Sequence, residues 1–340
     1  MTTILEKLEA FTQHYSSGIF GTPTPENDIP HASFTSDPAA ILSFGLGEEN
    51  GKQFVKVYTR KRVAKKSQLE FFEEMDVIYE VVGDDQYIDN AVTIIDEKYK
   101  KHNGYLACGS SVGRDRMAGT MGALLDIGGE LFGLSNNHVF GNYNFNHLHT
   151  QFNWPANIDT PPSATENTET IGRLHRINPF RFGITRHVKK NDFDAAIIKI
   201  DNADRVSSFQ RNQFDTPNDK CLPVSGMKVK KIGRSSNLTI GEIDVLHPLR
   251  ILDLKNKVIP SLPIGPMWSV KPTEINSEGD FIPFSLPGDS GSLVVTEDEE
   301  HALGIVVSGT KNGYAYISPI DPILEYFNAT LVSGHNIGNV

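Results

Sequence analysis

The sequence predicts a mainly β protein in which two consecutive β-barrels follow a small α+β module and a helix ends the chain. From about residue 118 onward, short apolar runs alternate with Gly, Asn and Pro turns, which is typical of paired β-barrels. Residues 1–104 instead mix helical and strand-like patterns. The chain has 340 residues, more than two such barrels require, which agrees with an additional module.

The N-terminal module is expected to combine two helices with three strands. Thr3 and Glu6 form a capping box, and Leu5, Leu8 and Phe11 lie at helical spacing, so a short amphipathic helix begins the module. The elements expected after this helix are strands at 40–45 and 54–59 joined by a hairpin turn, a helix at 68–75 and a strand at 77–82. The role of the module is open between gating a groove, docking a partner and bracing the first barrel.

The barrels and the closing helix are expected within residues 105–340. The first barrel is predicted at about 118–200, the second at about 222–318 and the helix at about 321–328. Asp321 suits an N-cap and Pro322 suits the first helical turn, so the helix is expected to begin there. The insertion at 247–283 contains Trp268 and several prolines, and it is expected to be a lid, a partner surface or a surface loop.

One turn carries the strongest chemical signal in the chain. In Gly288-Asp289-Ser290-Gly291-Ser292 a hydroxyl stands on a tight turn whose backbone N–H groups can converge on one point. A serine hydroxyl becomes an effective nucleophile only when a base takes its proton and donors meet the resulting oxyanion. We therefore expect Ser290 to act as a nucleophile, with a base and an orienting acid elsewhere in the chain.

His138 and Asp194 are the candidates for these two roles. His138 follows the strand-like run 131–134, and Asp194 leads into the apolar run 195–198. Asp192 competes for the acid role because it lies on the same side of an extended segment, but Asp194 directly abuts the apolar run. Each motif alone also fits a structural role in a turn or a cap. Their occurrence together favours catalysis.

The order of these residues along the chain, His138, Asp194 and Ser290, discriminates between the folds that carry such a triad. Subtilisin-type enzymes use the order Asp, His, Ser, and α/β-hydrolases use Ser, acid, His, whereas the chymotrypsin-type double barrel uses the order found here. The nucleophile elbow of the α/β-hydrolases also needs glycine two residues after the serine, where this chain has Ser292. The order therefore favours the double barrel.

Around these residues the sequence resembles the trypsin-like, chymotrypsin-fold serine peptidases. The resemblance extends to a branch of non-secreted bacterial peptidases related to the plant Narrow Leaf proteins, and it covers residues from about 105 to 328. The stretches that carry the resemblance beyond the three motifs above are Gly109-Ser110-Ser111-Val112-Gly113, Ala118-Gly119-Thr120-Met121-Gly122 and Gly233-Arg234-Ser235-Ser236.

The resemblance implies a chymotrypsin-like double β-barrel and a role for each matched residue. His138 would be the general base and then the general acid, Asp194 would hold its tautomer, and Ser290 would form the acyl-enzyme. The backbone N–H groups of Gly288 and Ser290 would form the oxyanion hole. The substrate pocket would be walled by Phe284, Ser285, Val307, Ser308 and Gly309. No carboxylate matches the base of that pocket, so a small or apolar substrate side chain is expected.

Asp289 is expected to need a partner inside the protein. In secreted relatives the matching aspartate pairs with an amino terminus freed by cleavage, but this chain contains no evident activation cleavage sequence. Our hypothesis is that an internal cation, with Arg234 as one candidate, or polar side chains hold Asp289 constitutively.

Composition bears on the location and partners of the protein. The net charge is −10 and basic residues do not cluster beyond 60–66, so no nucleic acid partner is expected. No apolar stretch reaches the roughly 20 residues that a membrane helix requires, and the first residues lack the features of a secretory signal. Cys108 and Cys221 are too few for a disulfide framework, and a cytoplasmic, bacterial protein is expected.

No metal and no cofactor are expected, because the His147 and His149 pair has no carboxylate or thiolate at supporting spacing. The expected function is that of a serine endopeptidase that cleaves a protein or peptide substrate in a regulatory or defence role. A regulatory partner would bind the N-terminal module or the 247–283 insertion. Two alternatives remain open: a catalytically silent scaffold that binds peptides, and a hydrolase of small esters.

Overall fold

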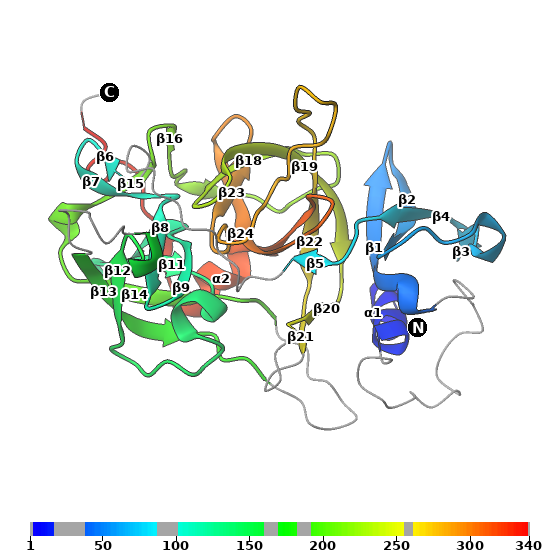
Figure 1. Cartoon of the computed structure of the whole chain (residues 1–340), viewed down its shortest axis with the longest axis horizontal. Coiled ribbons are helices and arrows are strands. Elements are labelled where there is room, and N and C mark those ends of the chain that lie inside the picture. The colour runs from blue at the N-terminus through cyan, green and yellow to red at the C-terminus, as the bar shows by residue number, and fades with distance from the viewer. Residues whose placement is uncertain are drawn as a thin grey trace.

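The computed structural model describes residues 3–16, 38–86, 101–159, 169–181, 192–254 and 261–338. Figure 1 shows three parts side by side: a first barrel in green, a second barrel in olive to orange, and the N-terminal module in blue. The second barrel lies between the other two parts, so it is the part that both neighbours contact. Among the described helices, none is long and apolar enough to span a membrane.

The N-terminal module consists of one helix packed on the face of a small sheet. Leu8 and Phe11 of the helix are fully buried and share a core with Phe44 and Val57 of the sheet. The predicted first helix, the first two strands and the hairpin between them are therefore confirmed. The elements are α1 (Ile4–Ser16), β1 (Ile41–Glu49), β2 (Lys52–Thr59), β3 (Phe71–Phe72) and β4 (Met75–Val81), after the short helices η3 (Pro38–Ala40) and η4 (Lys65–Ser67).

The helix predicted at 68–75 is wrong. Phe71–Phe72 instead pairs with the start of β4 in a tight turn at Glu73 and Glu74, both of which have positive φ. Phe72 is buried, and its ring meets the ring of Phe11 edge-on at 5.3 Å. Burial of this ring against α1 overrides the helical propensity of the Leu and Glu residues nearby.

The first barrel is an eight-stranded sheet curved around its own core. Its strands lie in the order β26-β10-β11-β14-β13-β12-β8-β9. The core includes Leu124, Phe152 and Ile198. The sheet begins at Ser111, slightly before the predicted residue 118. Its strands are β8 (Ser111–Arg114), β9 (Met117–Thr120), β10 (Ala123–Ile127), β11 (Glu130–Ser135), β12 (Gln151–Trp154), β13 (Glu169–Ile177), β14 (Ala196–Ile200) and β26 (Thr330–Leu331).

The second barrel closes on itself. Six strands follow one another in the order β18-β23-β24-β25-β22-β19, and β18 also pairs with β19, which closes the ring. The strands are β18 (Lys228–Gly233), β19 (Asn237–His247), β22 (Met267–Pro272), β23 (Leu293–Thr296), β24 (His301–Thr310) and β25 (Ala315–Pro319). The predicted mainly β class with two barrels is thereby confirmed.

Smaller elements join the two barrels. The predicted C-terminal helix is present as α2 (Ile320–Phe327), and its apolar face packs into a core that both barrels share, with Leu134 from the first and Ile305 from the second. A four-stranded sheet covers the link between the barrels. The strands of this sheet are β6 (Lys101–His102), β7 (Tyr105–Cys108), β15 (Val206–Gln210) and β16 (Phe214–Asp215), whereas β17 (Asp219–Lys220) pairs with β24 of the second barrel.

Strand pairing attaches the N-terminal module to the second barrel, and the module also shares a buried core with Tyr143 and Phe180 of the first barrel. β1 pairs with β19 at Leu46 and Leu246, and a short strand β5 (Asp85–Gln86) pairs with β24. These pairings brace the second barrel, and bracing of the first barrel stays an expectation. β1 is buried over most of its length and the buried residues of β19 recur largely at every second position, so both strands have apolar side chains to bury, which explains the attachment.

In its described part, the predicted insertion at 247–283 is a surface loop only at 275–282, where the residues are exposed. It contains barrel strand β22 and a hairpin of β20 (Arg250–Asp253) and β21 (Ser261–Ile264). Leu252, Leu262 and Ile264 of this hairpin are buried in a core with Leu42 and Tyr58 of the N-terminal module. The hairpin thus fills the seam between the module and the second barrel, and its apolar residues explain its burial.

Candidate active site

His138 and Asp194 meet because two neighbouring strands of the first barrel end side by side. β11 pairs with β14, with Ser135 opposite Ala196. Asp194 lies just before β14, and His138 lies in a short helical turn just after β11 (Asn137–Gly141, η6). Antiparallel pairing therefore brings the end of one strand to the start of the other, which places the two side chains together.

The pair is tightly hydrogen-bonded and buried. His138 Nδ1 donates to Asp194 Oδ2. Asp194 Oδ1 accepts the backbone N–H groups of Asn137 at 2.6 Å and of His138 at 3.2 Å. These contacts fix the imidazole with its proton on Nδ1, so Nε2 is left as an acceptor. Nε2 is buried, and no group in the described part of the chain forms a hydrogen bond with it.

Asp192, the competing candidate, is exposed, whereas Asp194 is fully buried. The two carboxylates therefore differ in environment although they are two residues apart. Of these two carboxylates, Asp194 is the one that forms a hydrogen bond with the imidazole.

The turn that carries Ser290 is anchored to the first barrel through Thr120. The Thr120 N–H donates to the carbonyl of Ser290 at 2.8 Å, and the Thr120 hydroxyl donates to the carbonyl of Gly288 at 2.9 Å. Gly288 has φ +103° and Gly291 has φ +91°, which explains glycine at both positions. The N–H groups of Gly288 and Ser290 have no acceptor among the described residues.

Ser290 and the His138 turn lie on either side of Gly119. A side-chain carbon added to Gly119 would lie 2.6 Å from Val139 Cγ2 and 3.1 Å from the carbonyl oxygen of Ser290. The residue after the histidine and the serine backbone therefore both touch the same glycine. Gly119 thus links the turn that carries His138 to the backbone of Ser290 at the junction of the two barrels.

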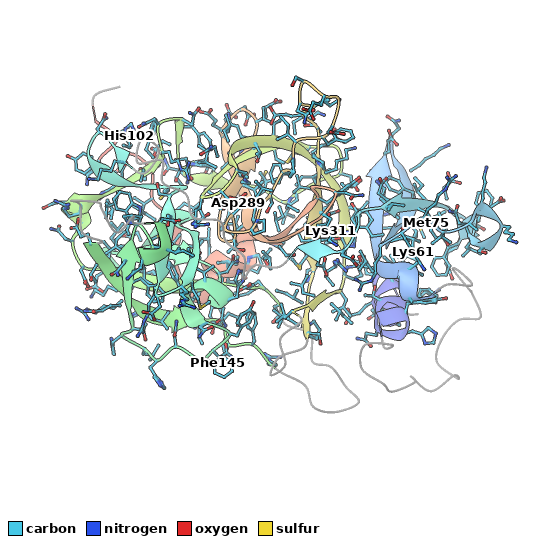
Figure 2. All side chains as sticks on the ribbon, in the orientation of Figure 1. Lys61, Met75, His102, Phe145, Asp289 and Lys311 are labelled. Carbon is cyan, nitrogen blue, oxygen red and sulfur yellow. The ribbon has the colours of Figure 1, made fainter. Side chains whose placement is uncertain are left out.

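The buried carboxylate of Asp289 has a full set of partners, and its cation is Lys231. Lys231 Nζ lies 3.0 Å from Oδ2, which also accepts the hydroxyl of Ser236 at 2.6 Å and the N–H of Leu286 at 2.9 Å. Oδ1 accepts the N–H groups of Ser235 and Ser236. Burial alone would raise the pKa of Asp289, but Lys231 and these donors hold it below its ordinary value. Figure 2 labels Asp289 within the second barrel.

Arg234, the cation proposed from the sequence, pairs with a different carboxylate. Its guanidinium binds Asp159 with two nitrogens, at 2.6 and 2.5 Å, and both side chains are buried. Asp159 belongs to a short helix of the first barrel (Asn157–Asp159, η7), so the pair connects the two barrels. Sequence reasoning did not find Asp159 or Lys231, because neither has a local signal that distinguishes it from a surface residue.

The residues predicted to wall the substrate pocket are distributed between strand β24, its neighbouring loop and the barrel core. Ser290 Oγ lies 3.5 Å from the carbonyl of Val307 on β24. Ser285 lies close to Gly309, and the Ser308 hydroxyl is buried with no hydrogen-bond partner among the described residues. Phe284 is fully buried in the core of the second barrel, with Ile243 and Val270.

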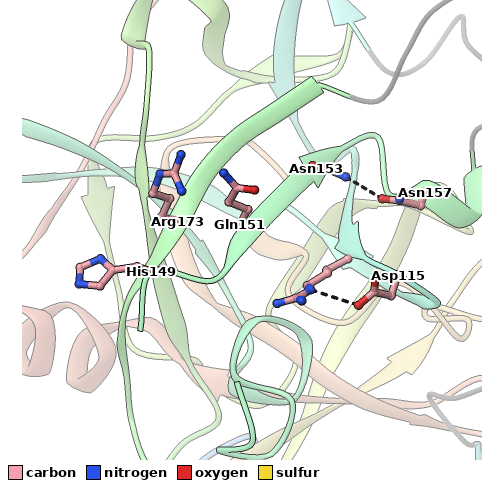
Figure 3. Close-up of a pocket in the computed structure, with 7 residues that line it drawn as sticks. Asp115, His149, Gln151, Asn153, Asn157 and Arg173 are labelled. Atoms are coloured by element: carbon pink, nitrogen blue, oxygen red, sulfur yellow. Dashed lines mark hydrogen bonds and ion pairs between the residues drawn. The ribbon is translucent and has the colours of Figure 1, made fainter. Parts of the chain in front are cut away.

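Two hollows on the first barrel lie next to each other. One, of about 350 Å³, is lined by Val139 and Asn142 beyond the histidine turn and by the β8–β9 hairpin. The other, of about 360 Å³, is shown in Figure 3, where His149, Gln151 and Arg173 line one side and Asn153, Asn157 and Asp115 the other. Within the described residues, the side chains close enough to share a metal ion are Asp298, Glu300 and His301, which does not include His147 or His149.

No protein-family model and no curated protein matches this sequence. The solved structures that resemble the chain are chymotrypsin-fold serine proteases. One is a glutamic acid-specific serine protease, with 17% identity, a TM-score of 0.43, and coverage of 67% of this chain and 100% of that chain. Protease A of Thermobifida fusca has 16% identity, a TM-score of 0.43, and coverage of 67% and 100%. The Nocardiopsis protease has 15% identity, a TM-score of 0.43, and coverage of 66% and 97%.

Proposed function

We propose that the protein is a serine endopeptidase that uses His138, Asp194 and Ser290. The observation that carries this proposal is the state of the imidazole. Its Nδ1 is held by a buried carboxylate, while its Nε2 is buried and accepts no hydrogen bond from the described residues. An oriented base beside a serine on a glycine-flanked turn is the arrangement that acyl transfer needs.

In the proposed reaction, Ser290 Oγ attacks the carbonyl carbon of the scissile bond while His138 Nε2 takes the hydroxyl proton. The carbonyl oxygen becomes an oxyanion and accepts the N–H groups of Gly288 and Ser290. His138 then gives the proton to the leaving amine, the C–N bond breaks and an acyl-enzyme remains. Water, activated by the same imidazole, releases the acid and restores the serine.

The contacts of Asp289 support an oxyanion loop that needs no activating cleavage. Lys231 and three backbone N–H groups hold this carboxylate beneath the loop. A buried aspartate that already has its cation does not require a newly freed amino terminus. These contacts support the hypothesis that an internal cation holds Asp289 without activation. The cation is Lys231 and not Arg234.

A fluorophosphonate probe tests the proposal. We expect covalent labelling of the wild-type chain, none of Ser290→Ala, and slow labelling of Asp194→Asn, in which the imidazole loses its orienting charge. An absence of labelling in the folded wild-type protein would favour the silent scaffold. Turnover of short esters with no turnover of peptides would favour the small-ester hydrolase. The cytoplasmic location and the regulatory partner stay predictions.

A further inference from the structure

The edge of β24 beside Ser290 is almost entirely occupied by the chain itself. β25 covers one edge of β24. Along the other edge, β23 pairs with residues up to Ile305, and Val306 exchanges hydrogen bonds with Gly291 and Ser292 of the nucleophile turn. β5 pairs further along, with Gln86 opposite Gly309 and Asp85 opposite Thr310. In the described part of the chain, only Val307 and Ser308 remain unpaired on this edge.

The hydrogen-bonding groups of Gly309 point toward β5. Thr310 uses its own N–H and C=O on the opposite side, with Tyr314 at 2.8 Å and Gly313 at 3.0 Å. Neighbouring residues of a strand alternate in direction, so the N–H and C=O of Gly309 face the edge where β5 lies. Gln86 therefore occupies the N–H and C=O of Gly309, which an added substrate strand would need for its own hydrogen bonds.

β5 also runs in the direction that a substrate would take. It is antiparallel to β24, so the step from Asp85 to Gln86 leads from Thr310 to Gly309, toward Val307 and Ser290. A peptide whose scissile carbonyl lies at Ser290 would pair its first residue ahead of the bond with Val307. Its third and fourth residues would then fall opposite Gly309 and Thr310, where β5 lies.

We propose that β5 is an internal competitor of the substrate, and that Arg250 recognises a carboxylate four residues ahead of the scissile bond. The inference rests on the proposed peptidase function and adds its substrate class and its regulation. In the resting chain, β5 fills the third and fourth substrate positions, so an extended substrate must displace it.

The contacts of Asp85 define the chemistry of the fourth position. Its carboxylate is bound by the guanidinium of Arg250, which is fully buried, lies over the ring of Tyr316 at 4.6 Å and donates to the carbonyl of Leu42 at 3.1 Å. Arg250 Nε is buried and has no partner among the described residues. A strand that replaces β5 in the same register would place its own side chain toward this guanidinium, so Asp or Glu there would take over the ion pair.

The neighbouring contacts of Asp84 also hold β5 in place. Asp84 pairs with Arg60 at 2.9 Å and with Lys311 at 3.5 Å, and the Lys311 N–H donates to its carbonyl at 2.9 Å. Figure 2 labels Lys311 beside the short strand β5. These partners are partly exposed, so they contribute less to holding β5 than a buried pair does.

The test compares peptides of different length on three forms of the full chain. One peptide has two residues ahead of the scissile bond. Two longer peptides have four residues there, share the two residues nearest the bond with the shorter peptide, and carry Asp or Asn in the fourth position. Gln86→Pro removes the N–H that pairs with Gly309, whereas Gln86→Ala keeps the backbone and is the matched control. For the wild type and Gln86→Ala, we expect kcat/KM to be only slightly higher for the longer peptides than for the shorter one. For Gln86→Pro, we expect kcat/KM to be about tenfold higher for the longer peptides, and higher with Asp than with Asn in the fourth position.

The inference is overturned if the wild type already gains about tenfold from the longer peptides and Gln86→Pro changes nothing. Fluorophosphonate labelling and turnover of the shorter peptide report on Ser290 independently of β5, so a failure of the peptidase function is distinguishable. If Gln86→Pro does not fold, hydrogen exchange of the wild type decides the matter. A four-residue peptide boronate bound to Ser290 should speed exchange of the amides in residues 82–86, and a two-residue boronate should not. Equal exchange with both would also overturn the inference.

Discussion

Two buried ion pairs flank Val307 and Ser308, which are unpaired on one edge in the described part of the chain, and the pairs differ in how completely their polar groups form hydrogen bonds. Beneath the nucleophile turn, Asp289 has a cation, a hydroxyl and three backbone N–H groups around its two oxygens. Beneath β5, Arg250 binds Asp85 but leaves its Nε without a partner among the described residues.

The difference indicates which side is fixed and which side can move. A buried charge is stable only when hydrogen bonds replace the water that it has lost. The Asp289 pair meets this condition, so it acts as a permanent support of the oxyanion loop. Among the described residues, the guanidinium of Arg250 meets it only in part, because its Nε has no partner, so we expect exchange of Asp85 for a substrate carboxylate to cost less than opening the other pair. The ion pair with complete hydrogen bonding thus supports the rigid oxyanion loop, and the ion pair with incomplete hydrogen bonding holds the exchangeable strand β5.

Removal of the cation on the rigid side should have the largest effect. Lys231→Met leaves Asp289 buried without its charge partner, and the free energy of unfolding should fall by about 3–5 kcal/mol. Lys230→Met is the matched control, since Lys230 pairs with the partly exposed Glu299 and should cost less than about 1 kcal/mol. Urea unfolding measures both. Equal losses in the two variants would contradict the supporting role of Lys231.

A change in the loop itself tests its geometry apart from its charge. Gly288→Ala should slow fluorophosphonate labelling about a hundredfold, because φ +103° is unfavourable for alanine and the new methyl would meet Arg234 and Ser235. Gly279→Ala is the control, since Gly279 also has positive φ but nothing near the added carbon. Similar labelling rates for both variants would argue against a fixed oxyanion loop.

Loss of the carboxylate on the exchangeable side should have a smaller effect on stability. Asp85→Asn keeps the shape but removes the charge opposite Arg250, and we expect a loss of about 1–3 kcal/mol, with faster cleavage of long peptides. Asp84→Asn, at a partly exposed position, serves as the comparison and should cost less than about 1 kcal/mol. Thermal unfolding and kcat/KM are the measurements. A loss that exceeds that of Lys231→Met would reverse the proposed ranking of the two pairs.

The smallest expected effect concerns pH at the seam between the module and the barrel. Burial, and then Arg250 and Lys56, hold the pKa of His247 well below its ordinary value of 6.5. In the unfolded chain His247 takes up a proton as the pH falls through about 6.5, whereas in the folded chain it stays neutral, so stability decreases on acidification. Between pH 7.5 and 5.5 the loss should be about 1 kcal/mol, and His247→Gln should reduce it. An unchanged pH dependence of Tm in that variant would exclude His247 as the cause.

Local patterns in the sequence were sufficient for the barrels, for α1 and α2, and for the candidacy of His138, Asp194 and Ser290. Alternation of apolar residues indicates which face of a strand is buried, and a serine flanked by glycines indicates a tight turn. Both signals lie within a few consecutive residues. The helix predicted at 68–75 failed because its composition was overruled by the contact of Phe72 with Phe11, which lies far away in the sequence.

Only the tertiary structure decided how distant charges were matched. Lys231 lies in a strand that contains several lysines, and nothing near it in the sequence indicates Asp289 as its partner. The same holds for the pair of Arg234 with Asp159 and for the pair of Arg250 with Asp85. The attachment of β5 to β24 is likewise invisible in a two-residue strand. Pairing of this kind depends on burial and on distances through space, which the order of residues along a chain does not contain.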